Sequence, residues 1–254
     1  MNRTAAVLRG LAFPLALVAA AQIGATIVDL KSDTLASPAA VAAAGARAFA
    51  DGSIPLGTLQ TLANAFGGLA LGGAVGLALG IVLGSYAVAD RLMEFSVEAL
   101  RPIPSVALIP VAMLIFGFGF RMEIAIVAFA AFWPVLILTR NAVAGLDPAL
   151  YDVARVLRLT PLARTRKIVL PAALPRIFVA FRLAAGIALT VAVTVEISTN
   201  PLGLGYGMIL AEQSLHPDLM LAYLLWIGVV GWALNYGILH AQRRLFGRSA
   251  QAVR

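Results

Sequence analysis

The sequence has no cysteine and only two histidines in 254 residues. Without cysteine, it can have no disulfide framework, thiol chemistry or cysteine metal site, and His216 and His240 are too far apart in the sequence to form a cluster. The sequence also lacks the Gly-x-x-x-x-Gly-Lys-Ser/Thr motif that cradles nucleotide phosphates. No linker or low-complexity tract marks off a second domain. We therefore expect neither a catalytic residue nor a metal site in this chain.

Charged residues are scarce as well. They make up 12% of the chain, whereas 61% of the residues are hydrophobic and the mean hydropathy is +0.93; soluble domains average about 25% charged and about 45–50% apolar residues. A soluble core of this length cannot bury so many apolar side chains, so the composition predicts an integral membrane protein. The net charge of +7 could indicate nucleic-acid binding, but basic residues beside lipid-embedded spans usually record orientation instead.

Six apolar segments are candidate transmembrane helices, which makes the predicted fold an all-α bundle. They cover residues 11–28, 58–86, 102–118, 124–140, 177–197 and 219–239, and several are near the length of about 20 residues that crosses about 30 Å of hydrocarbon. A cleaved signal peptide is the alternative for the first segment, because Ala19-Ala20-Ala21 offers small residues near a cleavage point. We favour a retained helix, since the apolar run continues to Leu30. Pro134 is expected to kink the fourth segment.

The segments between these spans are more polar. We expect an Ala-rich helical piece outside the membrane in residues 29–56, a short charged connection in 90–101, a tight turn in 117–123 and an external Gly- and Pro-rich loop in 198–218. The predicted organisation is an N-terminal transmembrane helix (1–30), an external segment (31–57), a core (58–245) that contains a polar loop (141–176), and a tail (246–254).

Basic residues are distributed very unevenly about these spans. With the amino terminus inside the cell, sixteen of the nineteen Lys and Arg residues lie on or near the cytoplasmic side: Arg3, Arg9, Arg91, Arg101, Arg140, Arg155, Arg158, Arg164, Arg166, Lys167, Arg176, Arg182, Arg243, Arg244, Arg248 and Arg254. Only Lys31, Arg47 and Arg121 fall outside. Because cytoplasmic loops carry an excess of Lys and Arg, we predict that both termini are cytoplasmic.

Five glycines in the second span recur at every fourth residue, namely Gly68, Gly72, Gly76, Gly80 and Gly84. Positions four apart advance about 400° around a helix, so these glycines form a slanting ridge along which another helix can approach at backbone distance. We expect helix packing along this ridge, either static or against a neighbour that moves during function.

The polar loop contains its own helix signals. Asp147 is a good N-cap, and Pro148 suits the first helical position. Apolar residues then follow at the i, i+3, i+4, i+7 spacing of one helix face, and charged residues occupy the other face; the apolar set is Leu150, Val153, Ala154 and Leu157, and the charged set is Asp152, Arg155 and Arg158. Thr160 precedes Pro161 and should end this helix.

Thr160 and Pro161 can also begin a second short helix, which carries Arg164, Arg166 and Lys167. Leu170-Pro171 and Leu174-Pro175 are expected to end it and lead into the fifth span. Residues 147–175 are therefore predicted to form a short amphipathic helical hairpin at a membrane surface.

This hairpin resembles the cytoplasmic "EAA" loop of bacterial ABC importer permeases, in which Glu-Ala-Ala, three residues, Gly and nine residues precede Ile-x-Leu-Pro. The spacing is kept here as Asp152-Val153-Ala154, Arg158 and Ile168-Val169-Leu170-Pro171. The flanking sequence is similar to the nitrate/sulfonate/taurine branch in 101–104 (Arg-Pro-Ile-Pro), 116–119 (Phe-Gly-Phe-Gly), 145–148 (Gly-Leu-Asp-Pro), 170–175, Glu196 and 203–206 (Gly-Leu-Gly-Tyr). The likeness covers about residues 50 to 245.

Two departures from the family pattern concern the loop itself. Asp152 keeps the charge of the family's Glu on a shorter side chain. Arg158 stands where the family has Gly, and an arginine would lose about 1–2 kcal/mol in the left-handed conformation that ends a helix there. We therefore expect Thr160-Pro161 to define the turn instead.

The resemblance implies a transport subunit of a type I ABC importer in the bacterial inner membrane, and not an enzyme. Such permeases pair as dimers around one pathway, dock two cytoplasmic ATPase subunits through coupling helices, and receive cargo from an external binding protein. No cofactor is expected in this chain, because ATP-Mg would bind the partner subunit. The implied cargo is a small anion such as a sulfonate, taurine or nitrate, with an organic cargo such as a vitamin precursor as the alternative.

The resemblance also assigns candidate residues. Those for ATPase coupling are Tyr151, Asp152, Val153, Ala154, Arg155, Arg158, Leu159, Leu170 and Pro171, and we expect Asp152 to contact the ATPase cleft directly. Pathway or gate candidates are Glu196, Thr190, Thr194, Met113 and Phe116. Glu196 could instead extend into the external headgroups, and Met113 and Phe116 could simply pack the bundle.

Two other classes of function compete with an importer subunit. A stand-alone carrier or channel would need coupling-ion residues near the middle of the membrane and inverted repeats, and neither is evident. A DNA-binding helix-turn-helix is disfavoured because the hairpin lies between two spans and could not enter a groove freely.

Overall fold

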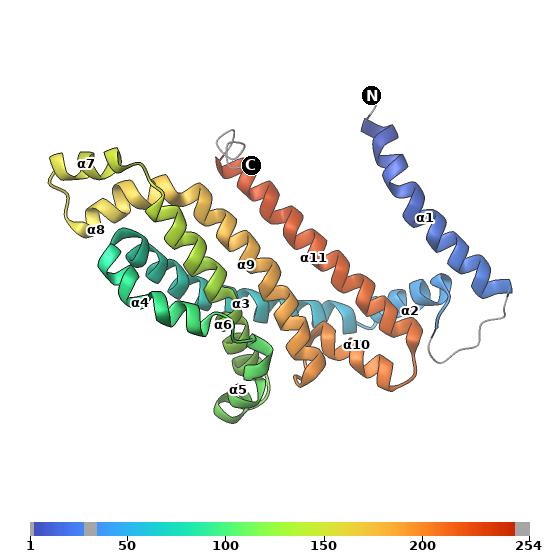
Figure 1. Ribbon diagram of the computed structural model, residues 1–254. Helices are drawn as coiled ribbons and strands as arrows, with labels where there is room; N and C mark the ends of the chain where they lie inside the picture. Colours follow the sequence, from blue (N-terminus) through green and yellow to red (C-terminus); the bar gives the residue numbers. More distant parts are fainter. Residues whose placement is uncertain (1–2, 28–34, 247–254) are drawn as a thin grey trace.

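The computed structural model describes residues 3–27 and 35–246, and within these ranges the chain forms helices and turns with no strand (Figure 1). The all-α membrane bundle predicted from composition is confirmed. Lys31, Arg248, Arg254, the end of the first predicted span and most of the predicted tail lie outside the described residues.

Four of the described helices are long and apolar enough to cross a membrane. They are α3 (Ser53–Ser85), α6 (Phe120–Ala144), α9 (Leu170–Ser198) and α11 (Pro217–Phe246). A bent pair of shorter helices passes the same test when taken together, and α1 (Arg3–Ile27) adds a further helix of 25 residues. The described part of the chain thus agrees with about six transmembrane helices.

The contact between α3 and α6 is the tightest in the bundle, and it runs along the predicted glycine ridge. Gly68, Gly72, Gly76, Gly80 and Gly84 all face α6. A Cβ atom at Gly72 would overlap the carbonyl oxygen of Ala128, and one at Gly76 would lie 2.7 Å from the carbonyl oxygen of Phe132. The two backbones therefore meet at a distance that side chains would prevent.

The third crossing differs from its prediction. The expected charged connection is an α-helix, α4 (Ala87–Leu100), and the expected continuous span consists of a 3₁₀ turn (Ser105–Leu108) followed by the short helix α5 (Ile109–Phe116). The two halves are bent by 81°. Pro102 and Pro104 lie at the break, where a residue without a backbone N–H cannot continue the helix, whereas Pro110 occupies the first turn of α5. The turn that follows ends at Gly119, so Glu123 lies within α6.

The predicted external loop at 198–218 is also largely helical. Residues Gly203–Gln213 form α10, which packs against α3, α9 and α11, and α11 begins at Pro217. The Gly and Pro content of this segment suggested a loop. Gly203 and Gly205 instead lie in the first turn of α10, where their backbone N–H groups donate hydrogen bonds to side chains of α3 and α9. The Ala-rich piece is α2 (Pro38–Ala50), and α3 begins at Ser53, earlier than predicted.

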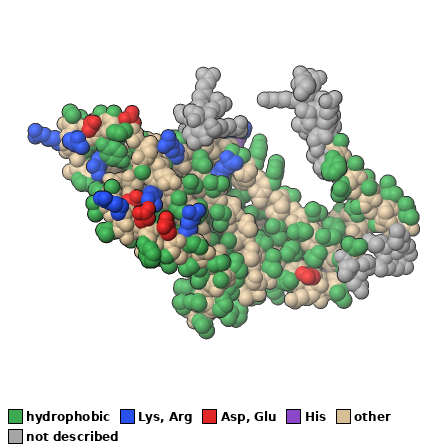
Figure 2. All heavy atoms as spheres, in the orientation of Figure 1, with side chains coloured by type: hydrophobic (Ala, Val, Ile, Leu, Met, Phe, Trp, Pro, Cys, Tyr) green, Lys and Arg blue, Asp and Glu red, His purple; other side chains and the backbone are tan. Residues whose placement is uncertain are grey.

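The bundle has two distinct ends (Figure 1). Helices α7 (Pro148–Val156) and α8 (Pro161–Arg164) lie at one end with the close of α11 and the beginning of α1, and α5 and α10 lie at the other. Lys and Arg side chains gather over α7, α8 and α4, while hydrophobic side chains cover the end formed by α5 (Figure 2). We call the first the hairpin end and the second the α10 end.

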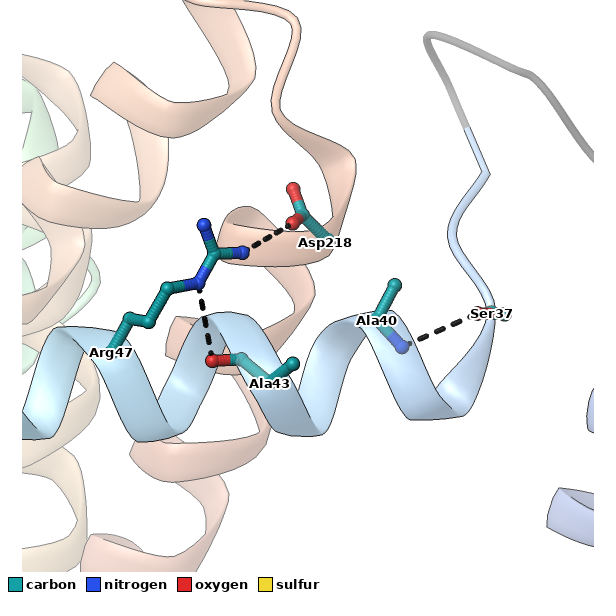
Figure 3. A network of polar contacts seen from close by, with 5 residues as sticks. All are labelled: Ser37, Ala40, Ala43, Arg47 and Asp218. Carbon is teal, nitrogen blue, oxygen red and sulfur yellow. Dashed lines mark hydrogen bonds and ion pairs between the residues drawn. The ribbon is translucent and has the colours of Figure 1, made fainter.

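Helix α2 is held at the α10 end by contacts with α11. Ser37 caps α2 by accepting a hydrogen bond from the backbone N–H of Ala40 (3.2 Å), and Arg47 forms an ion pair with Asp218 at 3.5 Å (Figure 3). Because Arg47 is largely exposed, this pair contributes little free energy. Val41, Ala44 and Ala48 are buried on the inner face of α2.

The glycine ridge gives a direct stability test. Gly72→Ala should force α3 and α6 apart, because the new methyl group overlaps backbone, and overpacking of this kind costs about 1–3 kcal/mol. We expect the apparent Tm in detergent, followed by tryptophan fluorescence, to fall by several degrees. The matched control is Gly237→Ala in α11, where a Cβ meets no atom within 4 Å; alanine should be neutral or stabilising there. Equal Tm values for the two variants would contradict the tight contact.

Candidate functional site

The helical hairpin begins as the sequence predicts. The side chain of Asp147 accepts a hydrogen bond from the backbone N–H of Ala149 at 2.9 Å, and Pro148 occupies the first turn of α7. The Thr160 hydroxyl likewise accepts from the N–H of Ala163 at 3.3 Å and caps α8. Both helices of the hairpin therefore start with a side-chain cap followed by proline.

The end of α7 contradicts the sequence-based expectation. Arg158 adopts the left-handed conformation with φ of 49°, so the position where the family has Gly keeps the glycine-like backbone. The N–H of Arg158 donates to the carbonyl of Arg155 and that of Leu159 to the carbonyl of Ala154, both at 3.0 Å. These two bonds form a Schellman motif. They offset the cost of about 1–2 kcal/mol for a non-glycine residue, and the helix ends at Val156 instead of Thr160.

The inner side of the hairpin is fastened to the bundle. Ala154 is buried, and the Tyr151 hydroxyl donates to the carbonyl of Val143 at 3.4 Å. The guanidinium of Arg164 lies over the rings of Tyr86 and Tyr151, 5.6 and 5.7 Å from their centroids. Cation–π contacts of this kind stabilise by about 0.5–1 kcal/mol or more, and here they join α8 to α7 and to the end of α3.

The second half of the hairpin does not end at the prolines as predicted. A π-helical turn, Thr165–Val169, leads directly into α9, with Pro171 in the first turn of α9 and Pro175 inside it. Val169 and Ala173 are buried in a cluster with Ala142 and Val143 of α6. The hairpin is therefore continuous with one span and packed against another.

The outer side of α7 is exposed and carries both charge and apolar surface. Asp152 and Arg155 form an ion pair at 3.0 Å on side chains that are 68% and 81% exposed. Val153, Val156 and Leu157 are also exposed. Of the remaining predicted coupling residues, Arg158 and Pro171 are exposed, while Leu159 and Leu170 are half-buried. The predicted set thus divides into a solvent-facing group and a group that fastens the hairpin.

A second candidate site lies at the α10 end, where polar side chains are buried among α3, α6, α9 and the start of α10. Thr61, Asn64, Glu123, Glu196 and Asn200 are each at most 1% exposed. We call these five residues the buried polar cluster. Buried polar groups need hydrogen-bond partners, and the partners here come from several helices.

Helix α10 starts on side chains from α3 and α9. The N–H groups of its first three residues donate to the side-chain oxygens of Gln60 (2.9 Å), Thr61 (2.9 Å) and Glu196 (2.8 Å). Gly203 has φ of +88°, and a Cβ atom there would overlap the Glu196 carboxylate. The Gly-Leu-Gly-Tyr sequence therefore lets a helix N-terminus approach a buried carboxylate, a favourable arrangement because the N-terminal end of a helix is partially positive.

The rest of the buried polar cluster joins α6 to the end of α9. The Asn200 amide donates to the carboxylate of Glu123. Five side-chain atoms in the cluster are buried without a hydrogen-bond partner among the described residues: both amide atoms of Asn64, one oxygen each of Glu123 and Glu196, and the amide oxygen of Asn200. Unsatisfied buried groups are costly, and such groups are a mark of functional regions. No three His, Asp or Glu side chains converge as metal ligands in the described ranges.

The predicted pathway residues are not all brought together. Glu196 is buried, so in this structure it neither extends into headgroups nor lines an open pathway. Thr190 is exposed on α9, and Thr190 and Thr194 donate their hydroxyls to the carbonyls of Gly186 (3.0 Å) and Thr190 (2.7 Å) in their own helix. Met113 packs beside a buried cluster that includes Met122 and Val195, whereas Phe116 is 46% exposed.

Sequence reasoning missed most of the buried polar cluster. It singled out Glu196 but not Glu123, Asn200, Thr61 or Asn64. Glu123 carried a usable signal, because an acidic residue directly beside a long apolar run is costly unless it is partnered. Thr61 and Asn64 gave little signal, since single Thr and Asn residues occur within many helices, and Asn200 meets Glu123 across 77 residues of chain.

A comparison with protein families matches residues 76–249 to the model described as "Binding-protein-dependent transport system inner membrane component". Among the similar proteins, a permease assigned to aliphatic sulfonates transport in Bacillus subtilis is 30% identical over 94% of this chain and 86% of its own length. A protein assigned as an ABC transporter permease in Methanocaldococcus jannaschii is 32% identical over 77% of this chain and 73% of its own length. A bicarbonate transport system permease of Synechocystis is 29% identical over 73% of this chain and 67% of its own length.

Solved structures show the same fold. An inward-facing form of the MetNI methionine ABC transporter superposes with a TM-score of 0.66 at 21% identity, covering 73% of this chain and 93% of the matched chain. An amino acid ABC transporter determined with histidines gives a TM-score of 0.61 at 18% identity, and the match covers 74% of this chain and 92% of the matched chain.

The start of α10 offers a second test. Glu196→Ala removes the acceptor for the N–H of Gly205, which should destabilise this end of α10 by about 1–3 kcal/mol. We expect amide hydrogen exchange in residues 203–206, measured by mass spectrometry, to become about 5- to 150-fold faster. Glu196→Gln keeps an acceptor and should change exchange much less. Glu212→Ala, an exposed acid on the same helix, is the control, and identical exchange in all three variants would argue against the contact.

Proposed function

Because the chain belongs to the family of binding-protein-dependent transport system inner membrane components, we propose that this ABC importer permease forms an alternating-access pathway for a small anion such as a sulfonate, taurine or nitrate. The relatives assigned to aliphatic sulfonates and to bicarbonate support this class of cargo. An organic cargo such as a vitamin precursor is the second candidate. Family membership disfavours a stand-alone carrier or channel.

The observation that carries this proposal is the hairpin. Its exposed face combines the Asp152–Arg155 ion pair with the apolar side chains of Val153 and Val156, a mixture suited to a cleft in a soluble subunit. Its inner side is continuous with α9 and packed on α6. We propose that ATPase subunits bind this face of the hairpin. They hydrolyse ATP-Mg themselves and thereby move the attached spans between inward-open and outward-open arrangements.

The remaining partners follow from the same scheme. A second copy of the chain would complete the pathway, and the exposed apolar side chains of α5, such as Leu114 and Ile115, suit either this copy or membrane lipid. An external binding protein would deliver cargo at the α10 end. The unit formed by residues 58–245 would act as the permease core, with loop 141–176 as its coupling element.

The proposed orientation can be tested directly because the chain has no native cysteine. Val156→Cys in the hairpin and Glu212→Cys on α10 both occupy exposed positions. In intact cells, a membrane-impermeant maleimide should label the Glu212→Cys variant and leave the Val156→Cys variant unlabelled; after permeabilisation both should react. Labelling of the Val156→Cys variant in intact cells would show that the hairpin faces the cell exterior, where a cytoplasmic ATPase subunit could not bind it.

The coupling role predicts the effect of reversing one charge. Asp152→Arg places a positive charge next to Arg155 and removes the acid from the exposed face, so it should uncouple transport. In proteoliposomes with the ATPase and binding protein, we expect ATP-dependent uptake to fall at least about tenfold, the equivalent of about 1.4 kcal/mol, while the membrane protein remains folded. Glu94→Arg, a charge reversal at an exposed acid on α4 outside both the hairpin and the α10 end, is the matched control. Unaltered coupled uptake by the Asp152→Arg variant would refute direct docking at Asp152.

A further inference from the structure

Helix α4 has three chemically different faces. Asp90, Glu94, Glu98 and Arg101 follow one another at four-, four- and three-residue spacing and form a polar stripe. Val88, Leu92 and Phe95 form an apolar stripe on the opposite side, and all three are exposed. Between them, Ala89 and Val97 pack against α3 and α6. A helix with an exposed polar stripe and an exposed apolar stripe suits a boundary between lipid and a water-filled cavity.

Contacts with α6 show how deep this polar stripe reaches. Near the hairpin end, Asp90 pairs with Arg140, 2.7 Å between Oδ2 and Nη2. Further along, Val97 packs with Leu136. Arg101 then shares a cavity with Phe129 and Trp133 of α6 and with Ile187 of α9. Eleven residues of helix separate Asp90 from Arg101, which corresponds to about 16 Å of helical rise.

Arg101 therefore lies at the bend of the broken span, about 16 Å along α4 from the Asp90–Arg140 pair. A charged residue within a membrane-spanning segment is expensive unless it faces a polar cavity or a partner. In the described part of the chain, no ion pair engages its guanidinium group.

The cavity beside Arg101 has a volume of about 430 Å³. Its walls are mostly apolar and aromatic, among them Phe129, Trp133, Ile137 and Ile187, and Ser105 adds a hydroxyl. Among the described residues that line it, Arg101 supplies the only charge. An apolar pocket with one fixed cation is the usual form of a site for a small amphiphilic anion. Arg101 also borders an adjacent hollow that Glu98 and Arg140 line, but Glu98 does not line this cavity.

We propose that this cavity is an anion-binding site within the membrane, in which Arg101 pairs with the sulfonate or carboxylate group of a solute and the aromatic wall holds its apolar part. This inference rests on the proposed function for the identity of the solute as cargo. A phospholipid headgroup has the same anionic chemistry and could occupy Arg101 from the lipid side, so the experiment must distinguish the two sources.

The test places a cysteine in the cavity of the cysteine-free chain through the conservative change Ser105→Cys. The assembled transporter is reconstituted in zwitterionic vesicles and labelled with two methanethiosulfonates, one carrying an ethylsulfonate and one carrying an ethyltrimethylammonium group. We expect the anionic reagent to react faster, and Arg101→Gln to lower the anion-to-cation rate ratio about tenfold. Arg101→Lys should keep much of the ratio, and Arg91→Gln, on the same helix near the hairpin end, should keep all of it.

Protection experiments identify the occupant. Ethanesulfonate should slow labelling of the Ser105→Cys variant when Arg101 is present and have no effect in the Arg101→Gln background. A ratio that does not respond to Arg101→Gln would overturn the site. Protection by added phosphatidylglycerol but not by ethanesulfonate would also overturn it, in favour of a lipid contact. Labelling needs no transport, so a failure of ATP-driven sulfonate uptake alone would contradict the proposed cargo and leave the anion site standing.

Discussion

The close contact between α3 and α6 is the constraint on which the other features depend. Lipid tails are as apolar as the side chains of the bundle, so helices in a membrane associate through packing and hydrogen bonds instead of the hydrophobic effect. The row of glycines brings the two backbones together. Helix α6 then supplies Glu123 to the buried polar cluster, Phe129 and Trp133 to the cavity, and Val143 to the contact beneath the hairpin. A shift of α6 against α3 would move all three.

Polar groups of the membrane-spanning part of the chain differ in whether they have a hydrogen-bond or ion-pair partner. At the start of α10, the first three N–H groups are satisfied by Gln60, Thr61 and Glu196, so these side chains hold one helix against two others. Arg101, at the bend between α4 and α5, is exposed and makes no ion pair among the described residues. The hydrogen-bonded groups at the start of α10 are explained by the structure they hold together, whereas an unpartnered arginine in a membrane-spanning segment would need a ligand or water.

Helix α9 links the two ends of the molecule. It begins at the π-helical turn of the hairpin, runs for 29 residues and reaches Glu196 beside the start of α10. A helix of this length spans about 43 Å, and its hydrogen bonds resist bending. If a soluble subunit displaces the hairpin, as proposed, α9 would connect that displacement to the α10 end without an intervening loop. The Arg164 contacts with Tyr86 and Tyr151 extend the same displacement to α3.

Features encoded by short-range patterns could be predicted from the sequence: the apolar spans, the four-residue glycine row, and the caps at Asp147 and Thr160 depend on periodicity and neighbouring residues alone. Features that depend on distant residues, or on the balance between a steric cost and local hydrogen bonds, could not. Arg158 takes the conformation of glycine because the hydrogen bonds of a Schellman motif outweigh its steric cost, and α10 forms because side chains far away in the sequence cap it. The place of Arg101 beside the cavity depends on how a broken span packs against α6. Local sequence thus determined the apolar spans and where the hairpin helices begin, whereas only the packing of those segments decided that α10 forms and where the buried carboxylates meet, because that requires contacts across tens of residues.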